Sequence, residues 1–431
     1  MTISNELRTG GLILLIMMVF ANALNYLFQV LMGRMLTLEE FGTMNALFSW
    51  FAIVSMPIAV VTTTTARYVA TYSAAGETEK IAKFLKRLLG YILLGAIGVL
   101  VVGVVLSPLV SRYTNINNTL LCVLLAVTLA VGMFMPLING AVQGTKQFLG
   151  LGMLNLGLTS IKLALGVGLV WLGFRLYGVM SALIAANLAM TLVGLYMMRG
   201  YIKQNVRMDA EELTLGKKDI AYYTLIAFAV NLCIALLSNV DMVFVKRFFT
   251  ESQAGLYGTA ALFGRLVFYI PSALVLAMFP IAAEAEVAGS GSRSVLTKAL
   301  LYVGGLAVLC AAGLNLFTSL AVQLLMGAKF LPAVPYVRMT SLMAIPVGLM
   351  MTLANYCLAV KKMRVLAVSM VVGCIGCVTA IEIYHASILQ IVLTISITAL
   401  VLFVFNLVYL FKTKKFNIVG VRTSQQRIVM L

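Results

Sequence analysis

"LMGRMLTLEEFG" (31–42) and "FVKRFFTESQAG" (244–255) are the two stretches that decide the fold. Each interrupts a long apolar run with charged residues and ends in glycine. At a constant offset of 213 residues, three positions align: Arg34 with Arg247, Thr37 with Thr250, and Gly42 with Gly255. The two stretches are therefore either one functional site written twice or one turn used twice.

The residues after each threonine favour the second interpretation. Thr37 is followed three positions later by Glu40, and Thr250 by Gln253. These are capping-box patterns, in which both side chains satisfy backbone N–H groups at a helix start. We therefore expect Thr37, Glu39, Glu40 and Gly42 to serve structure. Arg34 and Arg247 remain open, since they could snorkel or could line the outer rim of a cavity that receives an anion.

The composition places the chain in a membrane. Of 431 residues, 62% are hydrophobic and 10% are charged, whereas an ordinary soluble domain carries about 25% charged residues. Runs of roughly 20 apolar residues are long enough to cross a bilayer as helices. The sequence thus predicts an all-α polytopic membrane protein with twelve spans: 11–32, 41–66, 88–110, 118–144, 148–173, 176–198, 220–245, 255–284, 299–325, 336–360, 363–385 and 388–411. The first run continues through Leu31 and Met32, which favours a transmembrane helix over a cleaved signal peptide.

The distribution of the positive charges predicts the orientation. The net charge is +17, from 31 basic and 14 acidic residues. With a cytoplasmic N-terminus, 22 Lys and Arg residues fall on the cytoplasmic side and 6 on the outer side. The positive-inside rule then places both termini in the cytoplasm. Because these cations are spread over many short loops, we expect contacts with anionic membrane lipids and no nucleic-acid partner.

The aligned turns also predict an internal duplication. Each half would contain six spans and start on the cytoplasmic side, so the repeats would be parallel and related by an axis along the membrane normal. The expected divisions are an N-terminal six-helix lobe (1–205), a cytoplasmic linker (206–219), a C-terminal six-helix lobe (220–411) and a basic cytoplasmic tail (412–431). Transporters often hold their substrate between two such bundles.

The sequence offers little for catalysis. It contains no phosphate-binding GxxxxGK[ST] loop, no GxGxxG after a strand and no HExxH motif. The six cysteines lie in expected spans, and the single histidine, His385, cannot complete a zinc site. The longest outer loop is about ten residues, too short to position a glycosyl acceptor and a catalytic acid. We expect no enzyme activity, no cofactor and no metal site.

Charged residues at membrane depth are the candidates for function, because each costs about 2.5–3.5 kcal/mol at a helix centre. Lys162 lies in the middle of a span and Arg265 about ten residues into another. Either could face a cavity, although Lys162 could also snorkel and Arg265 could form an internal ion pair. Asp241 could equally pair with a neighbouring cation or act in ion coupling. A cavity with more cations than anions suits a phosphate, a diphosphate or an acidic sugar.

Uncharged amides add polar character to several spans. They could bind sugar hydroxyls, although hydrogen bonds between helices are the simpler explanation. These residues are Asn22, Asn25, Asn139, Gln143, Asn231 and Asn355.

Several stretches resemble the polysaccharide exporter, or O-antigen-type flippase, branch of the multidrug/oligosaccharidyl-lipid/polysaccharide (MOP) superfamily. They are "NYLFQVLMGRMLTLEEFGTMNALFSW" (25–50), "ARYVATYSAAGETEK" (66–80), "GFRLYGVMSALIAANL" (173–188) and "NVDMVFVKRFFTESQAGLYGTAALFGRL" (239–266). The resemblance implies two six-helix lobes around a central cavity in the bacterial cytoplasmic membrane. It also implies alternating access that moves an undecaprenyl-diphosphate-linked oligosaccharide from the inner to the outer leaflet. Other membrane proteins of glycan assembly are possible partners.

The resemblance assigns roles to two residues and leaves two rival functions. Arg265 resembles the cavity arginines that meet a lipid diphosphate, and Asp241 matches an acidic position common in the seventh span. The second span offers only Ala52, Ile53 and their neighbours where some lipid-diphosphate flippases carry an arginine, and the two further C-terminal helices of those relatives have no counterpart here. One rival is a multidrug and toxin extrusion antiporter of the same fold. The other is a non-transporting scaffold of a glycan-assembly complex.

Overall fold

A computed structural model describes residues 3–202, 217–287, 292–360 and 363–412. The described chain is helical almost throughout and contains no strand. Most of the expected linker and tail, residues 206–216 and 413–431, lie outside the described residues.

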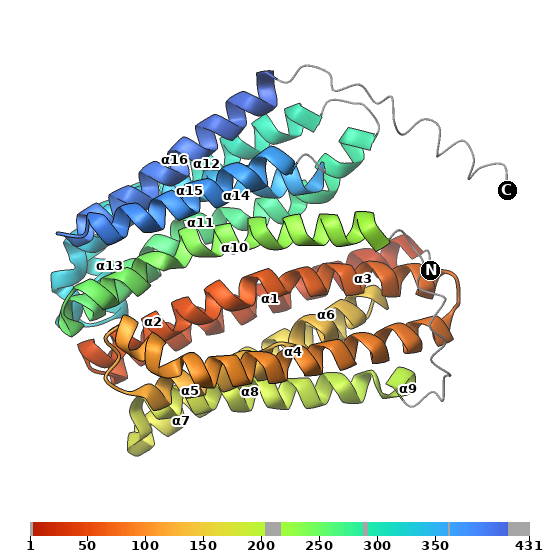
Figure 1. The fold of residues 1–431 in the computed structure, drawn as a ribbon, viewed down its shortest axis with the longest axis horizontal. Helices are drawn as coiled ribbons and strands as arrows, with labels where there is room; N and C mark the ends of the chain where they lie inside the picture. Colours follow the sequence, from red (N-terminus) through yellow and green to blue (C-terminus); the bar gives the residue numbers. More distant parts are fainter. Residues whose placement is uncertain (1–2, 203–216, 288–291, 361–362, 413–431) are drawn as a thin grey trace.

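The first half of the chain forms the helices on one side of the molecule (Figure 1). In order these are α1 (Ile3–Met35), α2 (Leu38–Ser55), η1 (Met56–Ile58), α3 (Ala59–Ala74), α4 (Thr78–Tyr113), α5 (Thr119–Gly132), α6 (Phe134–Gly144), α7 (Phe148–Leu169), η2 (Val170–Phe174), α8 (Arg175–Met197) and α9 (Arg199–Ile202).

The second half forms the helices on the other side. These are α10 (Lys217–Phe248), α11 (Glu251–Val287), α12 (Ser292–Leu316), α13 (Thr318–Leu325), η3 (Ala328–Ala333), α14 (Val334–Ala359), α15 (Arg364–Ile383) and α16 (Ile388–Lys412). We call the two groups the N-lobe (α1–α9) and the C-lobe (α10–α16).

The described helices confirm a polytopic membrane fold. Ten helical stretches are long and apolar enough to cross a membrane. One of the ten, Phe148–Met197, contains both α7 and α8, and α11 is not among the ten. The number of twelve spans therefore stays a prediction.

Three expected spans are interrupted. The second bends at η1, which contains Pro57, because proline lacks the N–H that a continuous helix needs. The fourth divides at Met133 into α5 and α6, and Pro136 lies in the first turn of α6, where its missing N–H costs nothing. The ninth ends at Leu316, and α13 follows as a separate short helix.

Both expected capping boxes are present. Thr37 accepts from the Glu40 backbone N–H at 3.2 Å while Glu40 accepts from the Thr37 N–H at 3.0 Å. Thr250 and Gln253 exchange the corresponding bonds at 3.3 and 3.2 Å. The opening stretches are thus one turn used twice, between α1 and α2 and between α10 and α11.

The two lobes meet along α2, α10 and α11. The contact begins at the end of the molecule that holds the turns at residues 36–37, 114–118 and 249–250 together with η3, which we call the turn end (Figure 1). From there α10 runs along α2 and η1. One buried apolar cluster includes Phe28 and Phe41 of the N-lobe and Phe244 and Phe263 of the C-lobe, so the lobes share a core.

Candidate functional site

Lys162 lies on α7 and faces α1. Its ammonium group donates a hydrogen bond to the side-chain oxygen of Asn25 and lies 4.7 Å from the centre of the Phe28 ring. Among the residues that the structure describes, Lys162 makes no ion pair with a carboxylate. It is therefore a half-buried cation whose contacts are an amide oxygen and a π face.

Arg265 and Asp241 form the internal ion pair that was one of the two expectations for Arg265. Nη2 of Arg265 lies 3.7 Å from Oδ1 of Asp241, and each side chain is 16% exposed. The Tyr257 hydroxyl donates to Oδ2 of Asp241 at 2.7 Å, which fixes the carboxylate from the neighbouring helix. Arg265 also reaches across to the N-lobe, where it donates to the Ser49 hydroxyl at 3.2 Å.

The two expected cavity cations belong to different lobes and do not touch. Residues of α1 and α2 connect them. Phe28, beneath Lys162, stacks on Phe48 with 6.3 Å between ring centres, and Phe48 precedes the Ser49 that accepts from Arg265. The printed contacts of Lys162 therefore lie within the N-lobe, whereas Arg265 lies at the seam between the lobes.

A small cavity of about 50 Å³ lies beside Arg265 within the C-lobe. Its lining includes Ser238, Asp241, Tyr257 and Arg265. Three atoms here are buried without a hydrogen-bond partner: Oγ of Ser238, Oδ1 of Asp241 and Nε of Arg265. Buried polar atoms of this kind are costly unless a water or a ligand satisfies them.

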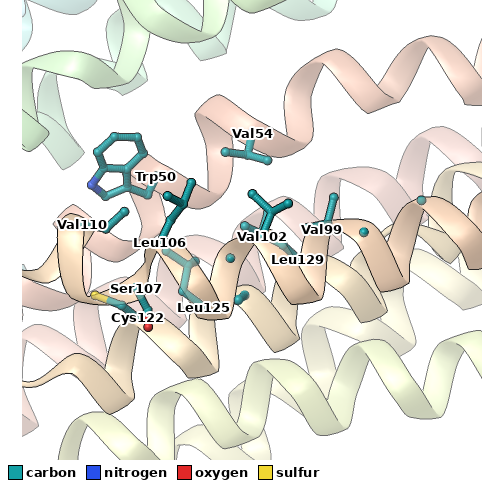
Figure 2. Close-up of a pocket in the computed structure, with 14 residues that line it drawn as sticks. Trp50, Val54, Val99, Val102, Leu106, Ser107, Val110, Cys122, Leu125 and Leu129 are labelled. Carbon is teal, nitrogen blue, oxygen red and sulfur yellow. The ribbon is translucent and has the colours of Figure 1, made fainter.

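A larger cavity of about 520 Å³ lies between α2, α4 and α5 (Figure 2). Trp50 and Val54 face it from α2, and Val102 and Leu106 from α4. Its lining is almost entirely apolar and contains no charged side chain.

Arg34 and Arg247 lie at the turn end, where the lobes touch. Arg34 donates to the backbone carbonyls of Leu324 and Leu325 in the C-lobe. Arg247 pairs with Glu382 and lies 3.9 Å from the centre of the Tyr113 ring in the N-lobe. In this structure both arginines contact the opposite lobe, and Arg34 is exposed.

No pattern in the sequence indicated the partners of these charged residues. Ser49 and Tyr257 are ordinary residues of apolar helices, and nothing in their spacing indicates that one meets Arg265 and the other Asp241. Asn25, the partner of Lys162, was one of six amides in the expected spans, and nothing in the sequence distinguished it from the other five.

Comparison with known families gives one match. A family model described as polysaccharide biosynthesis protein matches residues 31–335. No curated protein matches the sequence.

Solved structures show the same fold at low sequence identity. The lipid II flippase MurJ in an inward closed conformation aligns with a TM-score of 0.70 and 14% identity, covering 93% of this chain and 87% of that one. An inward-facing multidrug resistance MATE family transporter of the MOP superfamily gives 0.67 and 14%, covering 90% and 93%. A MOP superfamily transporter from Pyrococcus furiosus, described as having reversed binding-pocket polarity, gives 0.59 and 14%, covering 95% and 97%. These likenesses confirm the expected MOP-type fold.

Proposed function

The chain belongs to the family of polysaccharide biosynthesis proteins, and on that premise we propose that it is a flippase for lipid-linked oligosaccharides. Its substrate would be an undecaprenyl-diphosphate-linked repeat unit of an O-antigen, capsule or exopolysaccharide. The membrane would be the bacterial cytoplasmic membrane, with both termini in the cytoplasm and the turn end outside. The excess of Lys and Arg in the loops opposite the turn end supports that orientation.

The observation that carries the proposal is the uncompensated charge of Lys162. An ammonium group at membrane depth is costly, and no carboxylate of the described residues offsets it. A diphosphate that reached the ammonium group would offset its charge through charge-assisted hydrogen bonds, which are among the strongest available to a Lys. Asn25 and Phe28 hold the ammonium group in place without neutralising it.

Arg265 supplies the second cation, and its charge, unlike that of Lys162, is paired with a carboxylate. Asp241 already offsets its charge, and the Ser49 hydroxyl occupies one of its donors. The hydroxyl is a weak acceptor that a phosphate oxygen would readily replace when the lobes separate. In this scheme Lys162 provides the net attraction, and Arg265 provides directed donors from the opposite lobe.

The proposal is tested in a bacterium that depends on this gene for an exported polysaccharide. Deleting the gene should cause the lipid-linked oligosaccharide to accumulate on the inner leaflet, and an unchanged distribution would rule the proposal out. Lys162→Gln should reduce export at least tenfold at a normal membrane level of the protein, and Lys162→Arg should restore part of it. Lys298→Gln, at an exposed lysine of α12, is the matched control.

The same variants separate the two rival functions. Drug efflux that survives Lys162→Gln but fails with Asp241→Asn would favour the antiporter. Export that is unaffected by Lys162→Gln and by Arg265→Gln would favour the scaffold. The pairing of Asp241 with Arg265 and Tyr257 speaks against a free coupling carboxylate.

A further inference from the structure

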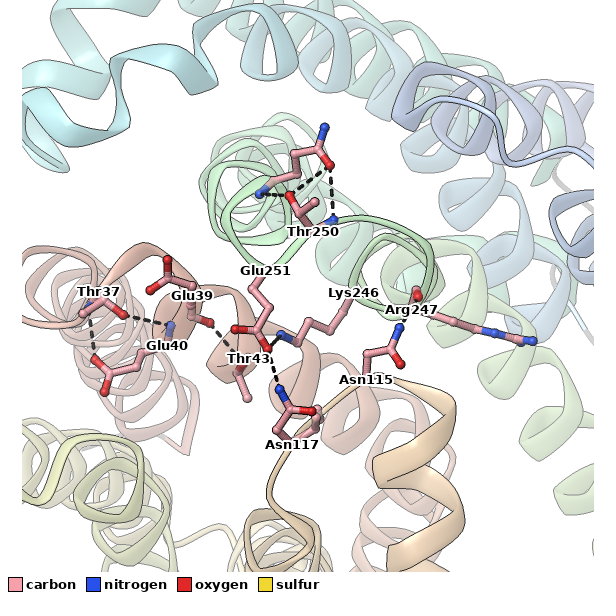
Figure 3. A network of polar contacts seen from close by, with 12 residues as sticks. Thr37, Glu39, Glu40, Thr43, Asn115, Asn117, Lys246, Arg247, Thr250 and Glu251 are labelled. Atoms are coloured by element: carbon pink, nitrogen blue, oxygen red, sulfur yellow. Dashed lines mark hydrogen bonds and ion pairs between the residues drawn. The ribbon is translucent and has the colours of Figure 1, made fainter.

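The C-terminal ends of α1 and α10 each meet a side chain from the opposite lobe. Lys329, in η3 of the C-lobe, donates to the carbonyls of Arg34 and Leu36 at 3.1 and 2.6 Å. Asn115, directly after α4 of the N-lobe, donates to the carbonyl of Arg247 at 2.6 Å (Figure 3). The last carbonyls of a helix lack intrahelical partners, so donors here stabilise the helix end.

The two contacts are related by the internal duplication. α1 and α10 are the first long helices of their lobes, and they end in the aligned residues Arg34 and Arg247. Asn115 precedes α5, and Lys329 lies in the corresponding connection before α14. Each lobe thus uses the segment before its fourth expected span to cap the first long helix of the other lobe.

The aligned arginines, Arg34 and Arg247, add further contacts between the lobes. Arg34 caps the end of α13 in the opposite lobe by donating to Leu325 at 2.8 Å and to Leu324. The Arg247 guanidinium packs on Tyr113 of the N-lobe, whose hydroxyl donates at 2.7 Å to Glu382, the ion-pair partner of Arg247. Every one of these contacts crosses between the lobes or is completed by a residue from the other lobe.

A backbone crossing lies between the two sets of contacts. A Cβ atom added to Gly42 would lie 2.7 Å from the backbone nitrogen of Gly255, and one added to Gly255 would lie 2.0 Å from the carbonyl oxygen of Leu38. Only glycine allows α2 and α11 to approach this closely. Asn117 adds a hydrogen bond of 3.3 Å to Glu251 beside the crossing (Figure 3).

We propose that these residues form a two-part latch that closes the turn end and must open for the lobes to exchange states. The proposal rests on the proposed function, because it takes the closed turn end as one state of an alternating-access cycle. The first part consists of Arg34 and Lys329 with the carbonyls they cap. The second consists of Asn115, Arg247, Tyr113 and Glu382. Gly42 and Gly255 allow the two parts to close together.

The latch is tested by measuring the distance between the lobes in the full chain in lipid nanodiscs. Spin labels are placed at Leu120 of α5 and Leu320 of α13, which are 53% and 62% exposed, after alanine has replaced the six native cysteines. Removing the Arg34 and Lys329 side-chain donors with Arg34→Gln and Lys329→Gln should shift the population toward longer distances. Because hydrogen bonds that involve a charged group are lost, we expect the ratio of open to closed states to rise at least about tenfold.

A control and a second variant make the result of the distance measurement decisive for the latch. Lys146→Gln, at an exposed lysine in the turn between α6 and α7, is the control and should leave the distances unchanged. Should the double variant fail to insert, Asn115→Ala, which removes one neutral hydrogen bond, carries the test with an expected shift of about fivefold. Distances that stay at the wild-type value would overturn the latch. Because no substrate is present, that result is independent of the leaflet assay, which decides the proposed function.

Discussion

Arg265 and Asp241 are each only 16% exposed, so each charge depends on the other. Removing one partner of a buried pair leaves the other uncompensated and typically costs 3–5 kcal/mol. We expect Asp241→Asn to lower the free energy of unfolding by about 3 kcal/mol, and the double variant Asp241→Asn/Arg265→Gln to recover part of that loss. Unfolding in detergent, combined as a double-mutant cycle, measures the coupling. Strictly additive losses would show that the pair does not act as a unit.

Thr37 should contribute through its cap alone, because its side chain is exposed and bonds to the Glu40 N–H. Thr37→Ala is expected to cost about 1 kcal/mol, as for other N-cap threonines. Thr250→Ala should cost a similar amount, since its cap has the same geometry. Thr37→Ser keeps the hydroxyl and serves as the control, so an equal loss in both Thr37 variants would contradict the capping role. Thermal unfolding of the purified proteins provides the comparison.

The separation of two interacting residues along the sequence decides whether their contact could be predicted from the sequence. The partner of Thr37 lies three residues away, so its cap could be recognised from the pattern alone. The Ser49 that meets Arg265 is 216 residues away, and the Leu324 and Leu325 carbonyls that bind Arg34 are about 290 residues away. Backbone carbonyls carry no sequence signature. The two interpretations of Arg34 and Arg247, snorkelling or a cavity rim, therefore could not take these contacts into account.

At the scale of elements, the crossing of α2 and α11 is a contact between the lobes that leaves no room for a side chain at Gly255. Gly255→Ala should prevent the two helices from closing, because the added methyl group would meet the Leu38 carbonyl. An overpacked contact of this kind costs about 1–3 kcal/mol. Gly305→Ala on α12 is the matched control, since its added methyl group meets nothing within 4 Å.

The expected result is a difference between the two alanine variants rather than a general loss. Gly255→Ala should lower the melting temperature and lengthen the distance between labels at Leu120 and Leu320. Gly305→Ala should leave the melting temperature equal to or slightly above that of the wild type, since alanine favours helix more than glycine does. Equal melting temperatures and equal label distances in the two variants would mean that α2 and α11 can separate at little cost in free energy.

Apolar runs predicted where the helices lie but not where they break. The breaks at η1 and before α6 lie beside Pro57 and Pro136, yet Pro108 lies inside α4 without dividing it. A proline interrupts a helix only where packing allows the chain to bend. That depends on neighbouring helices, which a single sequence does not reveal.

At the scale of the whole molecule, the duplication explains why the lobes meet as they do. One copy of the turn lies in each lobe, and the helices that follow the two turns, α2 and α11, pack against each other. The duplication was predicted because helix order, loop length and loop charge agreed in both halves, and the division into two parallel lobes of six spans stays a prediction. The sequence could not predict which end of the seam is closed, since two states of a transporter share one sequence.

A cross-link at the turn end should therefore stop transport reversibly. Asn117 of the N-lobe and Glu251 of the C-lobe touch through a hydrogen bond of 3.3 Å, so cysteines at these two positions lie within reach of a short bifunctional thiol reagent whose linker contains a cleavable disulfide. The six native cysteines must first be replaced by alanine, and the single variants Asn117→Cys and Glu251→Cys control for loss of the side chains. The cross-linking reagent should abolish glycan export by the double variant only, and a reductant should restore it, because the joined lobes cannot open the turn end. Export that continues in the fully cross-linked protein would show that the turn end need not open, and alternating access through this seam would have to be abandoned.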